Sequence, residues 1–324
     1  MKVAILGVPI DLGGRRRGVD MGPAAIRSAQ LTERILGLGH TVHDFGNLPG
    51  PDASTAPVGD LRLRYKPEIL KICRRLSDRV ARVVNQGFFP LILGGDQTVS
   101  IGTLSGLAQR GSNRGIIWMD AHGDFNTHET TPSGNIHGMA LAGILGYGHP
   151  GLVRLGGITP KALEENTVLI GGRSFDEGES LLLRRSKVTV FTMREIDELG
   201  VQKVVKEAIR VASRGVKEVH LSFDMDALDP LEAPGTGTPV PGGLTYREAH
   251  LAMEMLYDHQ VITSAEFVEV NPILDVRNQT GELTVQLILS LLGKQILKRV
   301  DGQHIRPRNR ETRISHRRTR PLQV

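Results

Sequence analysis

The sequence is poor in cysteine, with Cys73 as the only one among 324 residues. A single cysteine excludes an internal disulfide, as is typical of proteins that fold in a reducing compartment. The N-terminus runs directly into an apolar stretch without the features of a secretory signal, and no apolar run approaches the roughly 20 residues that a membrane helix needs. We therefore expect a cytoplasmic protein with no membrane association.

Motifs for nucleotide cofactors are also missing. The glycines between Gly7 and Gly14 lack the G-x-G-x-x-G order of a dinucleotide-binding turn, and no Gly-Lys-Ser/Thr phosphate loop occurs. Aromatic residues contribute only 4% of the chain, but hydrophobic residues reach 40%, which suffices for the core of a large domain. A nucleotide-dependent function is not expected.

Excess positive charge is confined to the C-terminus, although the whole chain carries +5. Residues 298–324 contain nine Lys or Arg and two Asp or Glu, whereas residues 1–297 contain 31 basic and 33 acidic residues. We therefore expect a domain over residues 1–297 followed by a basic extension over 298–324. Nucleic-acid binding by the domain is not expected; binding of nucleic acid or acidic partners by the extension stays open.

Short β-branched or Leu-rich runs alternate with longer helical patterns along the chain. The expected strands lie near 3–8, 41–45, 90–93, 115–119, 168–171, 188–191, 219–223 and 265–270. The expected helices lie near 23–37, 66–86, 98–109, 137–146, 202–213, 246–258 and 282–297. This alternation predicts a single α/β domain with a mostly parallel eight-stranded sheet flanked by helices on both faces.

Acidic residues cluster where two of the expected strands end. Asp120, His122 and Asp124 follow one strand, and their spacing of two residues would point them the same way in an extended chain. Asp224 and Asp226 follow another strand. Four carboxylates and a histidine brought to one edge of a sheet would repel one another without a cation. The two stretches predict a metal site, although the first alone could be a polar loop whose acids cap turns.

Other polar residues near strand ends have two interpretations each. Asp96 is either a helix cap or a partner of a metal ligand, and His137 is either structural or catalytic. Asp176 and Glu179 either bind a cationic group or begin a helix, which favours acids in its first turn. Glu269, which we expect in a buried strand, needs a partner for its charge.

Four short motifs become specific when they are taken together in chain order. They are Gly94-Gly95-Asp96-x-Thr98, Asp120-Ala121-His122-x-Asp124, Ser222-Phe223-Asp224-x-Asp226 and Glu269-x-Asn271-Pro272. The set resembles the arginase (ureohydrolase) family, bacterial type, over Ile5 to about Leu297. The resemblance implies one α/β domain around a parallel eight-stranded sheet, assembled as a homo-oligomer, either a trimer or a hexamer.

The resemblance implies a two-metal hydrolase. The implied ligands of two Mn²⁺ ions are Asp120, His122, Asp124, Asp224 and Asp226. The residue types agree, because Mn²⁺ suits oxygen-rich sites with little imidazole and no thiolate. A hydroxide bridging the ions would attack the guanidinium carbon of L-arginine and release L-ornithine and urea.

Roles around the substrate also follow from the resemblance. Glu269 would pair with the guanidinium group, Asp124 would stabilise the tetrahedral intermediate, and His137 would shuttle a proton. The α-carboxylate would be bound by Asn126, Thr131, Ser133 and Asn135, and the ammonium group by Asp176 and Glu179. The other implied substrate contacts are His122 and Thr238. Agmatine lacks the carboxylate and would leave those donors unpaired, so L-arginine is preferred over agmatine or a guanidino acid.

Gln97 departs from the family pattern, in which this position is normally a histidine bound to the more exposed metal. Glutamine is neutral and offers a carbonyl oxygen, a weaker ligand than imidazole. Three outcomes are open: this metal position is weakly occupied, Gln97 substitutes as a ligand with little effect, or the chain is a catalytically weakened arginine-binding protein.

Overall fold

The computed structural model describes residues 1–297, of which Met1–Lys294 forms one compact unit. Its strands are β1 Lys2–Val8, β2 Thr41–Asn47, β3 Phe89–Gly94, β4 Arg114–Met119, β5 Thr167–Gly172, β6 Thr189–Thr192, β7 Glu218–Asp224 and β8 Ile262–Val268. They form one sheet in the order β2-β1-β3-β8-β7-β4-β5-β6, and every neighbouring pair is parallel. The predicted fold class is confirmed. The expected basic extension, 298–324, lies outside the described residues.

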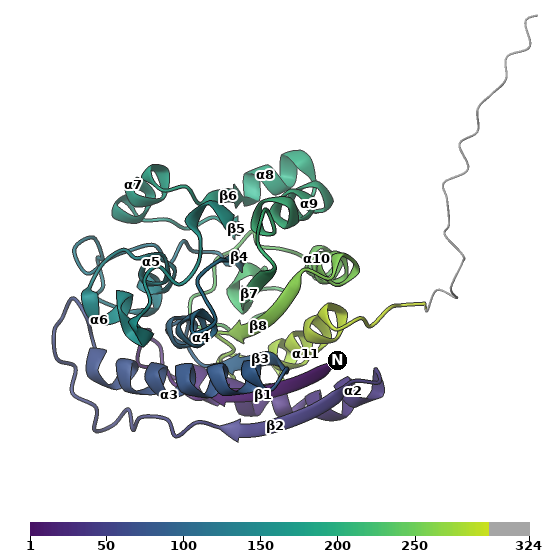
Figure 1. Cartoon of the computed structure of the whole chain (residues 1–324), viewed down its shortest axis with the longest axis horizontal. Helices are drawn as coiled ribbons and strands as arrows, with labels where there is room; N and C mark the ends of the chain where they lie inside the picture. Colours follow the sequence, from purple (N-terminus) through teal and green to yellow (C-terminus); the bar gives the residue numbers. More distant parts are fainter. Residues whose placement is uncertain (298–324) are drawn as a thin grey trace, which may run out of the picture. The chain divides into compact units, whose positions relative to one another are not determined.

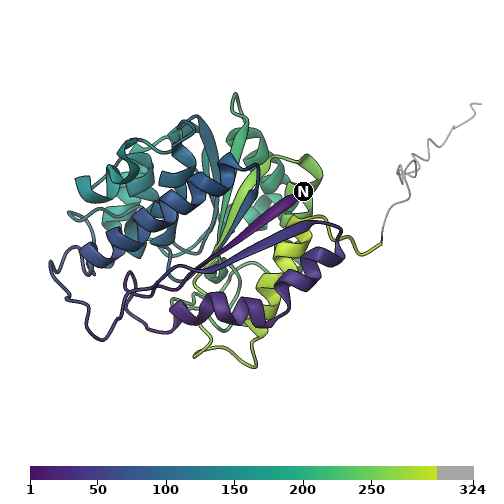
Figure 2. The same ribbon diagram turned by 60° about the horizontal axis from the view of Figure 1, so that its bottom comes forward.

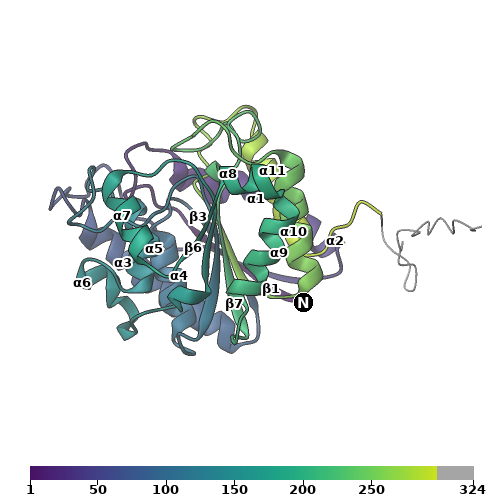
Figure 3. The same ribbon diagram turned by 90° about the horizontal axis from the view of Figure 1, so that it is seen from above.

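Helices cover both faces of this sheet (Figures 1 and 3). One face carries α3 Lys66–Asn85, α4 Val99–Ala108, α5 Ala140–Leu145, α6 Pro150–Val153 and α7 Glu177–Arg185. The other carries α1 Gly22–Ser28, α2 Leu31–Gly37, α8 Met193–Leu199, α9 Val201–Ala212, α10 Tyr246–His259 and α11 Gln279–Leu291. Within the described part of the chain, none of these helices combines the length and apolar character needed to cross a membrane.

Alternating side chains of the strands feed two separate cores. In β1, Val3 and Ile5 join the core on the α9–α11 side, whereas Ala4 and Leu6 join the core on the α3–α5 side. Figure 2 shows α1 and α2 beside α11 on the first of these sides, in agreement with their contacts. The inner strands are therefore buried on both faces, as expected for parallel strands, whereas the edge strand β2 is largely exposed.

Several predicted elements end at different residues in the structure, and for three of them the backbone shows the cause. The helix expected over 23–37 is split into α1 and α2 because Gln30 adopts a left-handed conformation with φ 61°. The helix expected over 282–297 ends at Leu291, close to a left-handed Gly293 that terminates it. The strand expected over 265–270 ends at Val268, because Glu269 has φ 64° and leaves the sheet. The short helices α6 and α8 had not been predicted, and α7 had been predicted only as the alternative in which Asp176 and Glu179 begin a helix.

Candidate metal and substrate site

The four central strands β3, β8, β7 and β4 are neighbours in the sheet and all run in the same direction. Their C-terminal ends therefore meet at one edge, which is where open α/β sheets place their ligands. The predicted metal and catalytic residues all lie in or next to the segments that leave these ends: Gln97 after β3, Glu269 after β8, Asp224 and Asp226 at β7, and Asp120, His122, Asp124 and His137 after β4.

Asp120, His122 and Asp226 form the tightest cluster, with one potential ligand atom from each lying within 4.8 Å of the others. His122 Nδ1 lies 3.1 Å from Asp226 Oδ2 and 3.4 Å from Asp120 Oδ1. Burial alone would lower the pKa of His122, but the two carboxylates raise it to about 12. Two buried carboxylates that face one imidazole mark a position that suits a cation.

Asp124 and Asp224 add two further carboxylates to the same space. Burial, followed by repulsion from Asp120 and Asp226 respectively, raises both pKa values well above the usual range. Asp124 Oδ2 is buried and has no hydrogen-bond partner within residues 1–297. The extended geometry expected for Asp120–Asp124 is wrong, because Asp124 has φ 49° and the chain bends there. The side chains nevertheless converge, and this oxygen-rich set fits a divalent cation such as Mn²⁺.

Glu269 has the partner that its buried charge requires. Its Oε1 accepts a hydrogen bond from the backbone N–H of Gln97 at 3.0 Å and lies 3.1 Å from His137 Nδ1. Burial alone would lower the pKa of His137, but Glu269 raises it. The side chain of His137 is 18% exposed, so this imidazole connects the buried Glu269 with solvent.

Asp96 fixes the turn between β3 and α4, although the N-cap residue of α4 is Thr98. Its carboxylate accepts hydrogen bonds from the backbone N–H groups of Gly13 at 2.6 Å and Thr98 at 3.0 Å. Burial, followed by repulsion from Glu269, raises the pKa of Asp96 to about 6. The adjacent Gln97 side chain is buried, and its amide donates to two serine hydroxyls.

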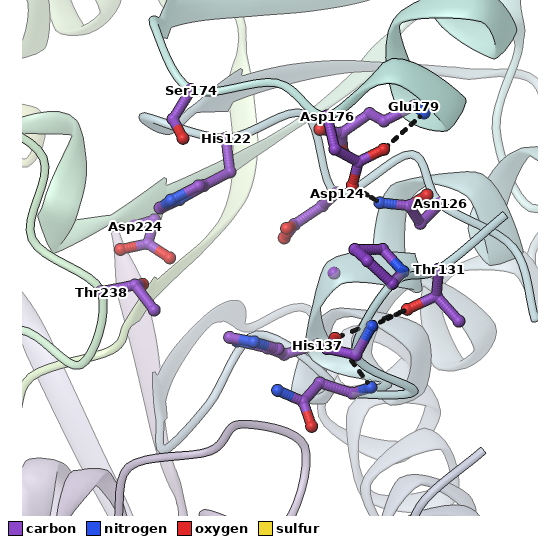
Figure 4. A pocket seen from close by; sticks show the side chains of 14 residues that line it. His122, Asp124, Asn126, Thr131, His137, Ser174, Asp176, Glu179, Asp224 and Thr238 are labelled. Carbon is purple, nitrogen blue, oxygen red and sulfur yellow. Dashed lines mark hydrogen bonds between the residues drawn. The ribbon is translucent and has the colours of Figure 1, made fainter. Parts of the chain in front are cut away.

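A polar cavity opens next to the acidic cluster (Figure 4). The predicted residues that line it are His122, Asp124, Asn126, Thr131, Ser133, Asn135, His137, Asp176, Glu179, Asp224 and Thr238, and Ser174 lines it without having been predicted. Figure 4 shows His122, Asp124 and Asp224 around one space, with Asn126 and Thr131 on another side of it. Asp120, Asp226, Gln97 and Glu269 are buried outside the lining. The cavity thus joins acidic groups to neutral hydrogen-bonding groups.

Asn126, Asp176 and Glu179 form one wall of this cavity. Asp176 caps α7 by accepting the Glu179 N–H at 2.9 Å, and its second oxygen accepts from Asn126 Nδ2 at 2.6 Å. Glu179 Oε1 accepts the Phe125 N–H at 2.8 Å, and burial raises the Glu179 pKa to about 7. Asp176 therefore begins a helix and faces the cavity as well, while Glu179 supports the loop that holds Asp124.

Hydroxyl groups order the remaining walls. Thr131 Oγ1 accepts the N–H of Ser133 at 3.3 Å, and Ser133 Oγ accepts the N–H of Asn135 at 3.2 Å. Thr238 Oγ1 donates to Asp226 Oδ2 at 2.9 Å. Thr238 therefore contacts an acidic residue of the cluster directly, a contact that was not predicted.

Two supporting side chains had also not been predicted. Trp118 Nε1 donates to Asp120 Oδ2 at 3.0 Å, and Arg173 donates to the backbone carbonyls of Asp226 at 2.8 Å and Leu228 at 3.2 Å. The spacing of two residues between Trp118 and Asp120 is a usable signal, since it places both on one side of the strand. Arg173 leaves no such signal, because Asp226 and Leu228 lie more than fifty positions away in the sequence.

Comparison with known proteins agrees with the resemblance in the motifs. The Arginase family model matches residues 1–293. The arginase of Bacillus subtilis strain 168 is 53% identical over 295 residues, which is 91% of this chain and 99% of that protein. The solved structure of Bacillus caldovelox arginase superposes with a TM-score of 0.89 at 52% identity, covering 91% of this chain and 99% of the other. For Bacillus cereus arginase the TM-score is 0.88 at 50% identity, covering 92% and 100%. The chain belongs to the arginase family.

Proposed function

We propose that the chain hydrolyses L-arginine to L-ornithine and urea with the help of two Mn²⁺ ions. The observation that carries this proposal is the composition of the cavity. Buried carboxylates lie on one side of it, and a loop of hydroxyl and amide groups, Thr131 to Asn135, lies on another. A ligand that carries a guanidinium, an ammonium and a carboxylate group matches this distribution of charge and hydrogen-bonding groups.

The residues proposed to hold the two ions are Asp120, His122, Asp124, Asp224 and Asp226. Their mutual repulsion and the unpartnered Asp124 Oδ2 support this role. When bound, the ions supply Lewis acidity that activates water at neutral pH. The hydrogen bonds from Trp118 to Asp120 and from Thr238 to Asp226 keep the carboxylates in place when the ions exchange.

Glu269 is proposed to pair with the guanidinium group in a charge-assisted contact. Its carboxylate is held by the Gln97 N–H, so little reorientation is needed when substrate enters. Asp124 stabilises the positive charge on the nitrogens around the attacked carbon. His137, which bridges Glu269 and solvent, delivers the proton that the departing amino group of L-ornithine requires.

Specificity is proposed to come from the far end of the cavity. Asn126, Thr131, Ser133 and Asn135 bind the α-carboxylate, and Asp176 binds the α-ammonium group, with Glu179 holding the loop behind it. His122 and Thr238 line the cavity beside the reacting end. Agmatine would leave the carboxylate-binding groups unpaired, which a polar pocket discriminates against strongly.

A comparison of L-arginine with agmatine tests this proposal. We expect kcat/KM for L-arginine to exceed that for agmatine by at least about 100-fold. Asn135→Ala should lower kcat/KM for L-arginine by roughly 10-fold, about the free energy of one hydrogen bond, and leave agmatine hydrolysis unchanged. Glu129→Ala, at an exposed position outside the cavity lining, serves as the control. Faster hydrolysis of agmatine or of a guanidino acid, or arginine binding without urea release, would overturn the assignment.

The family resemblance and the composition of the sequence also support a proposal for the organisation of the whole chain. We propose a catalytic domain over residues 1–297, a basic extension over 298–324, a cytoplasmic location and a homo-oligomer, either a trimer or a hexamer. Light scattering after size-exclusion chromatography gives the number of chains directly.

A further inference from the structure

A buried polar stripe runs along the face of the sheet that α4 covers. His220, Ser222 and Asp224 alternate along β7, and the register pairs Ser222 with Glu266 of β8 and His220 with Ser264. All five side chains are buried. Polar groups inside a core usually bond to one another, and hydrogen bonds of His220 to Ser264, of Ser100 to Glu266 and of Gln97 to Ser222 connect most of this stripe.

The network leads from His220 to Gln97. His220 Nε2 lies 3.3 Å from Glu266 Oε1, and the Ser100 hydroxyl donates a hydrogen bond to the same oxygen. Gln97 Nε2 donates to Ser100 Oγ at 2.6 Å and to Ser222 Oγ at 2.9 Å. We call His220, Glu266 and Ser100 the relay.

The relay determines which end of the Gln97 amide faces it. Burial alone would raise the pKa of Glu266, but His220 and hydroxyl donors lower it, so this carboxylate is ionised and can only accept. The single hydroxyl hydrogen of Ser100 is used on Glu266, and Ser100 Oγ must therefore accept from Gln97. The amide nitrogen has to face Ser100, and a flipped amide would place two acceptors against each other.

The carbonyl oxygen of the Gln97 side chain is left without a hydrogen-bond donor among the described residues. Gln97 Oε1 is buried and has no hydrogen-bond partner within the described part of the chain. The surroundings of Gln97 belong to the candidate metal site, since its N–H donates to Glu269 and its amide contacts Ser222, two residues before Asp224. A buried carbonyl without a partner is unfavourable unless a cation or a donor fills the space beside it.

We propose that Gln97 Oε1 is a ligand of one of the two cations, and that the relay positions the amide so that its oxygen faces the ion. The proposal rests on the metal site of the proposed function and defines how its two positions differ. His122 clusters with Asp120 and Asp226, which leaves Gln97, Asp124 and Asp224 for the second position. That position has only oxygen ligands from these residues, so it binds Mn²⁺ more weakly and disfavours Zn²⁺ and Co²⁺ compared with a site that has an imidazole.

Metal counting tests the proposal without reference to activity. Metal-stripped protein and its variants are dialysed against graded Mn²⁺, the bound metal is counted by mass spectrometry, and paired ions are detected by the exchange-coupled EPR signal of two Mn²⁺. We expect two ions per wild-type chain, the second at least 10-fold weaker than the first. Gln97→Leu should retain one ion and lose the coupled signal. Gln97→His should bind the second ion more tightly and accept Zn²⁺ at that position.

Ser100→Ala tests the relay, because it removes the group that orients the amide but no ligand. We expect the second ion to bind several-fold more weakly while the first is unchanged. Ser105→Ala is the matched control, since Ser105 is buried on the same helix and donates to the carbonyls of Ile101 and Leu155, outside the relay. Its metal binding should equal that of wild type.

Several results would overturn the inference. They are two equally tight ions in both wild type and Gln97→Leu, a single ion in both wild type and Gln97→His, and equal effects of Ser100→Ala and Ser105→Ala. If circular dichroism shows that Gln97→Leu is unfolded, Gln97→His and Ser100→Ala decide. Failure to release urea with this metal pattern intact would contradict the proposed function and leave the role of Gln97 standing.

Discussion

Lys161 is a fully buried basic residue that lies outside the candidate site. Its ammonium group donates to the backbone carbonyls of Leu152 and Val153, and its side chain is 0% exposed. Burial lowers its pKa from 10.5 to about 8. The folded chain therefore releases this proton at lower pH than the unfolded chain does.

This shift predicts a pH dependence of stability. Between about pH 8 and 10.5 the unfolded chain binds more protons than the folded chain, so the contribution of Lys161 to the free energy of unfolding rises with pH, by about 3 kcal/mol in total. Below about pH 8 Lys161 is protonated in both the folded and the unfolded chain, so it causes no pH dependence of the free energy of unfolding. Lys161→Met should remove the rise, as measured by the difference in urea unfolding free energy between variant and wild type at pH 7.5 and pH 10. Parallel pH profiles for the two proteins would contradict this account.

At the scale of elements, the contact between α3 and α4 is set by two glycines. A Cβ atom on Gly102 would lie 2.8 Å from the Cys73 carbonyl oxygen, and one on Gly106 would lie 2.5 Å from the Ser77 carbonyl oxygen. The two helices therefore pack with their backbones close together. Because α4 follows Gln97 and contains Ser100, this packing also determines where the relay meets the candidate metal site.

We expect Gly106→Ala to destabilise the chain by about 1–3 kcal/mol, since the new methyl group meets backbone atoms that cannot rotate away. The measurement is the midpoint of urea unfolding. Gly37→Ala is the matched control, because Gly37 ends α2 in open space and alanine should there be neutral or stabilising by up to about 1 kcal/mol. An equal effect of the two substitutions would contradict the close packing inferred for α3 and α4.

Sequence periodicity predicted the elements that have a clear pattern of apolar residues and many buried side chains. The inner strands were found because runs such as Val3–Val8 are buried on both faces, so nearly every residue is apolar. The helix α8 was missed because it spans only Met193–Leu199, although its Thr192 and Glu195 form a capping box that was readable. The break at Gln30 was not predictable, since glutamine has no preference for the left-handed conformation found there.

The candidate site was predictable where it follows strand ends and unpredictable where it depends on contacts across the sheet. The motifs containing Asp120 and Asp224 place their carboxylates at one edge once the strands are known to be parallel. The partners of Gln97 lie outside this logic, because Ser222 is 125 positions away and becomes a neighbour only through the strand order. The orientation of the Gln97 amide therefore required the structure.

For the whole molecule, the acidic cluster makes the stability of the fold depend on the binding of the proposed ions. Its carboxylates sit at the ends of β4 and β7, which are neighbours, so their repulsion acts on the middle of the sheet. Ions that bind only the folded chain relieve this repulsion and stabilise the fold by mass action. Metal content, stability and activity should therefore change together.

Urea release from L-arginine by metal-stripped protein, titrated with Mn²⁺, tests the proposed hydrolysis and the role of the ions together. We expect no release without metal and a rate that rises with Mn²⁺ until the weaker, second position is filled. The rate should therefore follow the second ion and not the first. Absence of urea at saturating Mn²⁺ would contradict the proposed arginine hydrolysis, and full activity in the metal-stripped protein would contradict the role of the ions.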